Sequence, residues 1–345
     1  MKRIILLVSF VLAVVASNAQ RVDLDRFYFK ATYRNLPLKP LGFEYKTFDA
    51  QATFTAGVGK LFTPEEITGK FVIEGFQPAT ENPDVTIKFS AEDIQLYRTE
   101  VKNRVEEAKD KNGNVTSRKT IYWFEIEYSM SVKYELFDNK KNASVTSARV
   151  AGRDDKYIFK SSETSTHAGA RDFYFLNKEM VIRNIMDERF TEYIKFINAT
   201  LTTNYGYRVD TATELLWILG AKKHADFEEY NRIYKVINDA FANMTSDASV
   251  EPVAEALKPA IEYLNGIIEK YKADEKNDKK MRYSAYYNLA KIYLFLDMPD
   301  EVIKMGNLII TNDYDTRDGK NLIEDANKLK ELFAKNNMNT RHFER

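Results

Sequence analysis

Cysteine is absent from this chain of 345 residues. Its absence excludes disulfide bridges, thiol nucleophiles and thiolate metal sites. It also excludes a lipoprotein, because the lipid anchor of such a protein is attached to a cysteine. The fold must therefore rest on packed cores, for which an apolar content of 44% is ample.

An excess of charge of either sign is also lacking. Lys and Arg together number 51, as do Asp and Glu. Once Lys2 and Arg3 are set aside, 49 basic residues remain against 51 acidic ones, a formal charge of −2. On electrostatic grounds, nucleic acid and anionic membrane surfaces are thus poor partners.

Long apolar runs are limited to one, at the start of the chain. Lys2 and Arg3 precede the run from Ile4 to Ala16, and Ser17-Asn18-Ala19 follows it, an order typical of a secretory signal peptide. The run has 13 residues, whereas roughly 20 are needed to span a bilayer. We expect residues 1–19 to be removed, leaving an exported or periplasmic protein that begins near Gln20 and has no integral membrane segment. An uncleaved anchor is the alternative.

Recognisable catalytic motifs are missing as well. The sequence contains no phosphate-binding loop, nucleotide fingerprint, nucleophile elbow or zinc-binding His-Glu-x-x-His pattern. The three histidines, His167, His224 and His342, are too dispersed to indicate a shared metal site. We predict no enzyme activity and no cofactor, although a Ser-His-Asp triad is spatial and the sequence alone does not exclude one.

One acidic stretch resembles a calcium-binding loop. Asp313, Asp315 and Glu324 occupy positions one, three and twelve of an EF-hand-like pattern. Arg317 stands at position five, where a cation opposes calcium, and Asp318 replaces the glycine needed at position six. We therefore interpret Asp318-Gly319 as a turn between two helices and predict no metal site.

The clearest pattern that is present lies between Thr120 and Phe137, where every second residue is apolar. Polar residues fill most positions between them, as in an antiparallel strand that is covered on one side. The stretch exceeds the usual strand of about five or six residues, so we expect it to bend or to cross between packed sheets. The apolar positions are Tyr122, Phe124, Ile126, Tyr128, Met130, Val132, Tyr134 and Leu136.

Shorter extended stretches flank this strand and predict a β domain over residues 20–165. Turn signals separate them, with a short helical start at residues 63–66 and a hairpin turn at Asn112-Gly113. That turn is the tip of a polar arm, residues 104–119, which is either a protruding contact element or a solvated hairpin end. Connections too short for helices favour an antiparallel β-sandwich-like fold over a βαβ unit. The other predicted strands are residues 27–33, 43–55, 69–76, 85–89, 144–150 and 156–160.

The apolar period changes from two to 3.6 beyond about residue 178. The Ser/Thr-rich stretch Ser161–Gly169 precedes this change, so we place a domain boundary there and an α-helical domain over residues 170–345. Pro259 is expected in a first helical turn, and the charged residues 272–280 in a loop. Helices are predicted around residues 182–197, 215–219, 230–241, 261–271, 283–303 and 322–333.

One segment of that domain, Tyr283–Ile310, resembles a tetratricopeptide repeat. The family places an aromatic residue, a leucine, a small residue and a second aromatic residue on its first helix. Here Tyr286, Leu289, Ala290 and Tyr293 stand at those positions. The resemblance implies a tail of stacked helix pairs that binds other proteins, rather than an enzyme.

The second helix of this segment departs from the family. Val302 stands where alanine is usual, Gly306 stands where a large apolar residue is usual, and the closing proline is missing. From the resemblance we expect Ala290 to face the second helix closely, with Gly306 serving the same contact from the other side. Lys291, the next residue, is expected to point to solvent.

Together these observations favour an exported, non-enzymatic protein of the cell envelope that acts as a protein-interaction or scaffold module. The expected partner is another envelope protein or peptide. A glycan-binding module is the alternative, with surface tyrosines and Trp123 as stacking platforms, although aromatic residues are also favoured in strands. A weaker alternative is a hydrolase whose site the sequence does not reveal.

Overall fold

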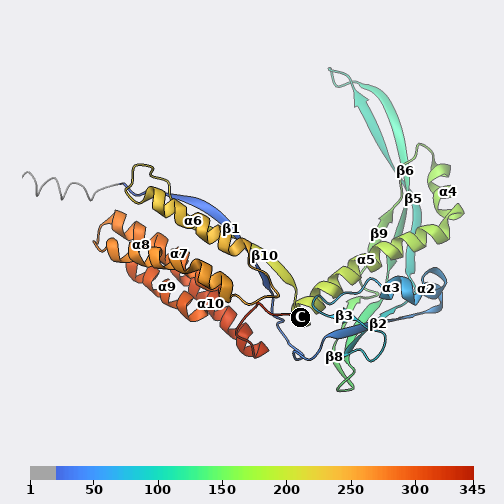
Figure 1. Cartoon of the computed structure of the whole chain (residues 1–345). Coiled ribbons are helices and arrows are strands. Elements are labelled where there is room, and N and C mark those ends of the chain that lie inside the picture. The colour runs from blue at the N-terminus through green and yellow to red at the C-terminus, as the bar shows by residue number, and fades with distance from the viewer. Residues whose placement is uncertain (1–20) are drawn as a thin grey trace, which may run out of the picture. The chain divides into compact units, whose positions relative to one another are not determined.

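The computed structural model describes residues 21–345, and the predicted signal peptide, residues 1–19, lies outside the described residues. The chain folds into two compact units. Of the described residues, unit 1 contains 21–40 and Gly206–Arg345, and unit 2 is Leu41–Tyr205. Strands predominate in the first half of the chain and helices in the second, which confirms a mixed two-part architecture (Figure 1).

Unit 2 is built on a five-stranded sheet with the order β3-β2-β4-β7-β8. β4 pairs antiparallel with β7, and β7 with β8. β2, however, pairs in parallel with β4, from Phe48 opposite Val85 to Phe54 opposite Ala91. The expectation of an antiparallel fold without a βαβ unit is therefore wrong. These strands are β2 (Thr47–Phe54), β3 (Gln77–Pro78), β4 (Val85–Ala91), β7 (Val132–Asp138) and β8 (Ala143–Ala151).

Two short helices occupy the crossover that parallel strands require. They are α2 (Ala56–Leu61) and α3 (Pro64–Thr68). α3 begins with a capping box, in which the Thr63 side chain accepts from the Glu66 N–H and the Glu66 side chain accepts from the Thr63 N–H. The helical start predicted at residues 63–66 is confirmed. The strand predicted at residues 69–76 is wrong, because pairing in this region begins only at Gln77.

The long alternating stretch is divided between two sheets. β6 (Val115–Ser129) belongs to a three-stranded sheet with β5 (Gln95–Lys109) and β9 (Tyr157–Lys160), whereas β7 belongs to the five-stranded sheet. From Phe124 to Leu136 the alternate apolar side chains are all at most 5% exposed. The expectation that this stretch crosses between sheets is confirmed.

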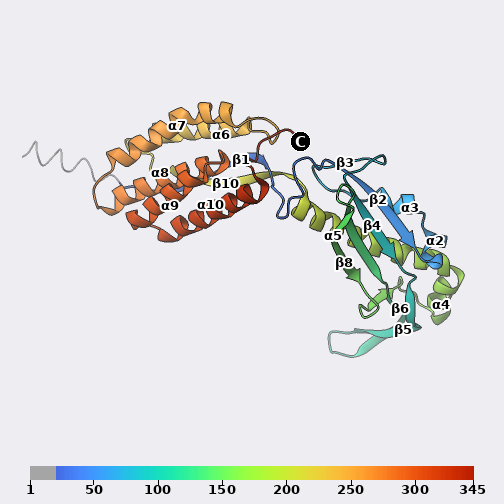
Figure 2. The same cartoon turned by 90° about the horizontal axis from the view of Figure 1, so that it is seen from below.

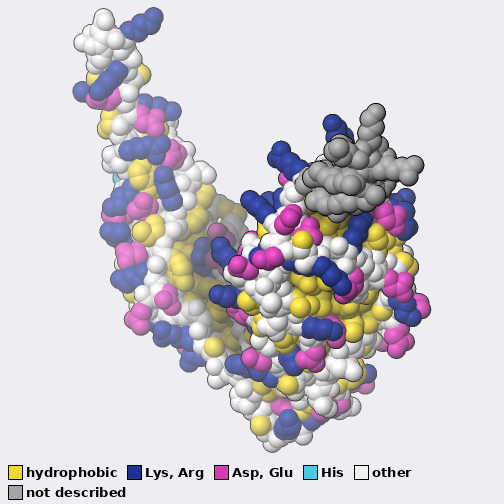
Figure 3. Space-filling view, turned by 90° about the vertical axis from the view of Figure 1, so that its left-hand side faces the viewer, with side chains coloured by type: hydrophobic (Ala, Val, Ile, Leu, Met, Phe, Trp, Pro, Cys, Tyr) yellow, Lys and Arg dark blue, Asp and Glu magenta, His cyan; other side chains and the backbone are white. Residues whose placement is uncertain are grey.

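β5 and β6 continue as a hairpin arm, residues 104–119, beyond the rest of their sheet (Figure 1). β9 pairs with β6 only from Glu125 to Tyr128, so the arm is a two-stranded ribbon. Gly113 has a φ of 85° in the turn, a conformation that glycine adopts without strain. The hairpin predicted at Asn112-Gly113 is confirmed. Side chains of both charges are interspersed along the arm, the projection at the upper left of Figure 3.

α4 (His167–Leu176) and α5 (Lys178–Tyr205) complete unit 2. The apolar face predicted for α5 is buried. At its middle the ring of Phe190 meets those of Phe62 and Phe89, with centroids 5.2 and 5.7 Å apart. α5 thus packs on the strands of unit 2, and the domain boundary predicted at Ser161–Gly169 is wrong. The change of period marks the start of a helix within the same unit.

Unit 1 contains a two-stranded antiparallel ribbon. β1 (Leu24–Arg34) pairs over its whole length with β10 (Val209–Leu219). The helix predicted at residues 215–219 is therefore wrong. Five consecutive apolar residues have no period of their own, and here they form a strand against which both α6 (Phe227–Ala242) and α8 (Lys276–Phe295) pack.

The core of unit 1 lies between this ribbon and the helices. Phe29 of β1 stacks on Phe241 of α6 with 4.6 Å between ring centroids, and it meets Phe295 of α8 edge-on at 5.8 Å. Each large side chain that is fully buried contributes roughly 1.5–3 kcal/mol to folding. β1, the first of the described strands, is therefore held in place by α6 and α8, which come much later in the chain.

The helices after β10 pack each against the next, as Figure 2 shows. α7 (Glu251–Lys270), α9 (Pro299–Asn312) and α10 (Thr316–Asn336) join α6 and α8. Pro259 lies inside α7 rather than in its first turn, and α8 begins at Lys276, so the loop predicted at residues 272–280 is shorter than expected. Within residues 21–345 the helices are too short or too polar to cross a bilayer.

Candidate functional site

The residues that carry the repeat resemblance lie on α8. Leu289 and Ala290 are fully buried, Tyr286 is 7% exposed, and Tyr293 is partly buried. α8 and α9 pack against each other. These predicted residues therefore belong to the core of unit 1, where they hold helices together rather than form an open site.

Gly306, the remaining residue of the predicted set, serves a different contact from the one expected. A Cβ atom added at Gly306 would lie 2.6 Å from Ile323 Cγ1 and 2.9 Å from the Gly319 carbonyl oxygen. A Cβ atom added at Gly319 would lie 2.5 Å from the Gly306 carbonyl oxygen. The two glycines let α9 approach α10 closely, so the expectation that Gly306 faces Ala290 on α8 is wrong.

Lys291 does not point to solvent, contrary to the expectation, since the residue is only 9% exposed. Its Nζ donates a hydrogen bond to Glu214 Oε2 of β10 at 2.8 Å. The ribbon thus covers a side of α8 that an isolated helix pair would leave open to water.

A buried amide completes the backbone pairing of β10. Asn288 Oδ1 accepts from the Trp217 N–H at 2.8 Å, and Asn288 Nδ2 donates to the Trp217 carbonyl at 2.9 Å. The Tyr234 hydroxyl donates to the same carbonyl at 2.6 Å. These side chains supply the hydrogen bonds that a third strand would supply to the backbone at this point. Backbone groups that are shielded from water need such partners.

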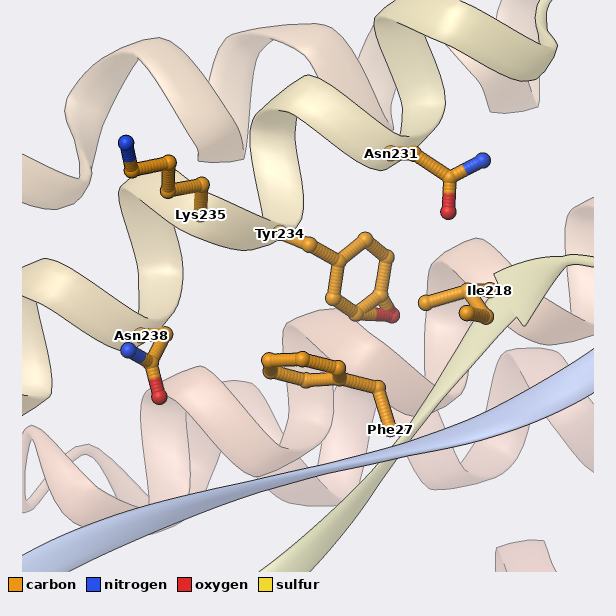
Figure 4. A pocket seen from close by; sticks show the side chains of 6 residues that line it. All are labelled: Phe27, Ile218, Asn231, Tyr234, Lys235 and Asn238. Atoms are coloured by element: carbon orange, nitrogen blue, oxygen red, sulfur yellow. The ribbon is translucent and has the colours of Figure 1, made fainter.

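A pocket of about 200 Å³ lies between the ribbon and α6 (Figure 4). Its walls are Phe27 of β1, Ile218 of β10 and Tyr234 of α6. The rings of Phe27 and Tyr234 meet edge-on with 5.2 Å between centroids. Further residues of α6 line it, namely Asn231, Lys235 and Asn238.

The polar groups at this pocket are largely committed to the fold. The Tyr234 hydroxyl is bonded to the Trp217 carbonyl, and burial raises the pKa of Tyr234 well above its usual range. Asn231 Nδ2 donates to the carbonyls of Phe227 and Leu219 at 2.7 and 3.3 Å. Lys235 is exposed and supplies a cation. The six lining residues therefore suit binding of an apolar group beside a negative charge, and they include no nucleophile with a base.

The sequence alone does not predict this pocket, because the residues that form its walls are far apart in the sequence. Phe27 is expected in a strand and Tyr234 in a helix, and both expectations are confirmed. Ile218 is assigned to a helix, so the β1–β10 pairing that places it near Phe27 is not foreseen. No spacing in the sequence signals such a pairing.

The histidines are not brought together. His167 is exposed in unit 2, whereas His224 and His342 are buried in unit 1. Burial lowers the pKa of both buried imidazoles. Across residues 21–345, no three His, Asp or Glu side chains lie close enough to hold a metal ion.

His342 belongs to a buried cluster that fixes the C-terminal tail. Its Nδ1 lies 2.7 Å from the Thr245 carbonyl oxygen, and its Nε2 lies 3.9 Å from Asp297 Oδ2. Arg341 Nε donates to Asp297 Oδ1 at 2.6 Å. Because the His342 side chain is 0% exposed, this cluster is closed to a substrate.

The calcium-like stretch is part of the helical packing. Asp313 ends α9 in the left-handed conformation with a φ of 53°, and Asp318 Oδ2 accepts a hydrogen bond from the Tyr283 hydroxyl at 2.6 Å. Asp318-Gly319 lies within α10. The prediction of a turn at these two residues is wrong, because the chain reverses before α10 begins at Thr316.

A cation lies over the ring of Trp123. Lys160 Nζ lies 4.2 Å from the centroid of its ring, and its Nε1 donates to Glu125 Oε1 at 2.8 Å. Such a cation over an indole is a stabilising contact. A sugar stacked on that face would have to displace Lys160.

Comparison with models of protein families finds no match, and comparison with curated proteins finds none either. Among solved structures, one that matches is described as a neuraminyllactose-binding hemagglutinin homolog from Helicobacter pylori. The two chains share 13% sequence identity with a TM-score of 0.24, and the match covers 48% of this chain and 89% of that chain. A similarity at this level carries no argument about the function of this chain.

Proposed function

We propose that this protein is an exported, non-enzymatic component of the cell envelope that binds another protein or peptide. The observation that carries the proposal is the pocket formed by Phe27, Ile218 and Tyr234, with Lys235 beside it. A cavity of about 150 Å³ accommodates benzene, so about 200 Å³ suits one large apolar side chain. A carboxylate next to that side chain would meet Lys235.

We also propose that the helices of unit 1 are tetratricopeptide-like. The burial of Tyr286, Leu289 and Ala290 on α8 supports this proposal, and the contact of Gly306 with α10 departs from it. The family resemblance implies protein interaction. It agrees with the binding role that the pocket suggests, but the pocket supports that role independently.

Export is supported by the order of charged, apolar and small residues over 1–19. Sequencing the N-terminus of protein recovered from outside the cytoplasm tests it, with Gln20 as the expected first residue. Recovery of Met1 on membrane-bound protein would contradict export with cleavage.

The pocket is tested by recovering partners from envelope extract with the chain that begins at Gln20. Lys235→Glu reverses the charge at the rim, and Asn238→Trp fills the opening. We expect each variant to retain at most a tenth of the recovered partner, a loss of about 1.4 kcal/mol or more in binding free energy. Lys320→Glu, at an exposed position of α10, is the matched control. Equal recovery with all four chains would contradict the proposal.

A glycan is a second candidate ligand, because aromatic rings and side-chain amides at one pocket are also suited to a sugar. The observation that favours it is the position of the Asn238 amide at the same pocket as the ring of Phe27 (Figure 4). Adding soluble saccharides to the same recovery experiment separates the two. A saccharide that binds the isolated protein, and whose binding Asn238→Trp abolishes, would support the glycan.

A further inference from the structure

Unit 2 exposes three large apolar side chains where α4 meets α5. Phe175, Leu176 and Met180 are 63%, 81% and 50% exposed, and we refer to these three as the apolar corner. One residue, Asn177, separates the two helices. The three side chains therefore lie close together in sequence at the junction of the two helices, and Leu176 and Met180 line the same groove there.

The fold fixes this exposure. Tyr174, the residue before Phe175, is buried with its ring stacked on Phe124 of β6 at 4.5 Å between centroids. On the other side of the corner, Val181 and Ile182 of α5 are buried. Because both helices are held by these neighbours, the side chains between them face outward.

Cations flank the apolar corner. A groove of about 470 Å³ lies beside it, between the end of α2 and the start of α5, and Figures 1 and 2 both place α2 and α4 at the same end of unit 2. Arg183 in this groove donates to Glu66 at 2.9 Å. Lys60 and Lys178 are exposed and form no ion pair with the described residues. The lining is Lys60, Leu61, Leu176, Asn177, Lys178, Glu179, Met180 and Arg183.

We propose that the apolar corner inserts into the surface of a lipid bilayer that contains anionic phospholipids, with Lys60 and Lys178 against the headgroup phosphates. Apolar side chains that project from a bend, flanked by lysines, are the features of an interfacial membrane contact. The near-zero net charge argues against binding to an anionic surface only when charge is averaged over the whole chain. A local group of cations can still bind such a surface. At this corner the cations outnumber the carboxylates. The contact is separate from the pocket of unit 1 and does not depend on the function proposed for it.

Flotation with vesicles tests the inference, using the chain from Gln20 to Arg345. We expect binding to vesicles of phosphatidylcholine with phosphatidylglycerol, and at least tenfold weaker binding to phosphatidylcholine alone. Added salt should weaken the first, because it screens charges. Phe175→Ser combined with Leu176→Asp should reduce binding to the anionic vesicles at least tenfold. Lys60→Glu combined with Lys178→Glu should abolish the preference for anionic lipid.

The matched control is Phe196→Asp, because Phe196 lies on the same helix α5 and is 57% exposed. It should bind as the unaltered chain does. Equal losses for Phe196→Asp and the corner variant would overturn the proposal, as would undiminished binding by the corner variant. An unaltered chain that floats with neither kind of vesicle would also overturn it, and would leave the corner as a surface for a protein.

Discussion

The side-chain amide of Asn288 forms hydrogen bonds with the backbone N–H and carbonyl of Trp217 at the edge of the β1–β10 ribbon, where a third strand would otherwise pair. Asn288→Ala would leave the partly buried Trp217 N–H without a partner, which costs about 1–3 kcal/mol. We expect the free energy of unfolding, measured in urea, to fall by about 1–3 kcal/mol. Asn265→Ala should change it by less than about 0.5 kcal/mol, because that side chain is exposed on α7 and its amide donates to the Ile261 carbonyl of the same helix. Equal effects would mean that the pairing with Trp217 contributes little.

Asp84 makes the stability of unit 2 depend on pH. Its carboxylate accepts from the N–H groups of Lys46 and Thr47 at 2.6 and 2.9 Å, and Lys140 Nζ lies 2.8 Å away. Burial raises the pKa of this carboxyl, but these hydrogen bonds outweigh that effect and hold the pKa at about 2. The pKa in the unfolded chain is about 3.9. The stabilisation is therefore complete above that value and is lost as the pH falls toward 2.

We accordingly expect Asp84→Asn to destabilise the protein by about 1–2 kcal/mol at pH 7. The difference from the unaltered chain should shrink as the pH falls from about 4 toward about 2. Urea unfolding of both chains at several pH values measures this difference in the free energy of unfolding. Asp154→Asn, at an exposed position of unit 2, is the control and should change the free energy of unfolding by less than about 0.5 kcal/mol at pH 7. A difference for Asp84→Asn that does not vary with pH would contradict the electrostatic account.

Lys291 and Ala290 show what sequence can and cannot predict about single residues. Ala290 is buried as expected, because helical period and a small side chain both indicate a packed position. Lys291 is buried as well, because Glu214 offers it a partner. That partner lies on β10, which was not expected as a strand and of which residues 215–219 were expected in a helix, so the environment of Lys291 could not be foreseen.

At the scale of elements, the approach of α9 to α10 depends on two glycines. Gly306→Ala would bring a Cβ atom to 2.9 Å from the Gly319 carbonyl oxygen, and such overpacking costs about 1–3 kcal/mol. Gly266→Ala on α7 meets nothing within 4 Å and should instead stabilise the protein by about 0.4–1 kcal/mol, because Ala favours a helix over Gly. Thermal and urea unfolding of both variants measures these opposite signs. Stabilisation by both substitutions would show that α9 and α10 can separate at little cost.

Elements with a clear period were predicted, and those without one were not. The alternating apolar residues from Phe124 to Leu136 predict a strand, and the helical spacing of apolar residues in α5 predicts a helix with one buried face. Residues 215–219 are all apolar, so strand and helix fit them equally. The parallel pairing of β2 with β4 was missed for another reason. An apolar pattern records which face is buried and does not record which strand lies alongside.

At the scale of the whole molecule, unit 2 is an insertion into a hairpin of unit 1. Arg34 lies opposite Val209 at the end of the ribbon, and the Asn35 N–H donates to the Arg208 carbonyl at 2.7 Å. We expect a shortened chain, in which an Asn-Gly turn joins Asn35 directly to Arg208, to keep unit 1 folded, because such a turn suits antiparallel strands.

Circular dichroism and urea unfolding of the shortened chain measure this outcome, with helix content and one cooperative transition as the expected result. A second shortened chain that also lacks residues 21–34 is the control. It should lose cooperativity, because β1 supplies Phe29 to the core between α6 and α8. A shortened chain with helices but no cooperative transition would show that unit 1 needs unit 2.

The pairing of β1 with β10 also sets an order of events during biosynthesis. The hydroxyls of Thr32 and Thr211, 3.0 Å apart in the ribbon, belong to residues 179 positions apart. At the usual rate of translation, roughly 10–40 seconds pass between the synthesis of β1 and the synthesis of β10. Unit 2 ends at Tyr205 and can fold within that interval, whereas β1 has a free edge and uncovered aromatic side chains, a template for wrong pairing. Until β10 is synthesised, β1 is therefore the segment of unit 1 that is most open to pairing with a wrong strand.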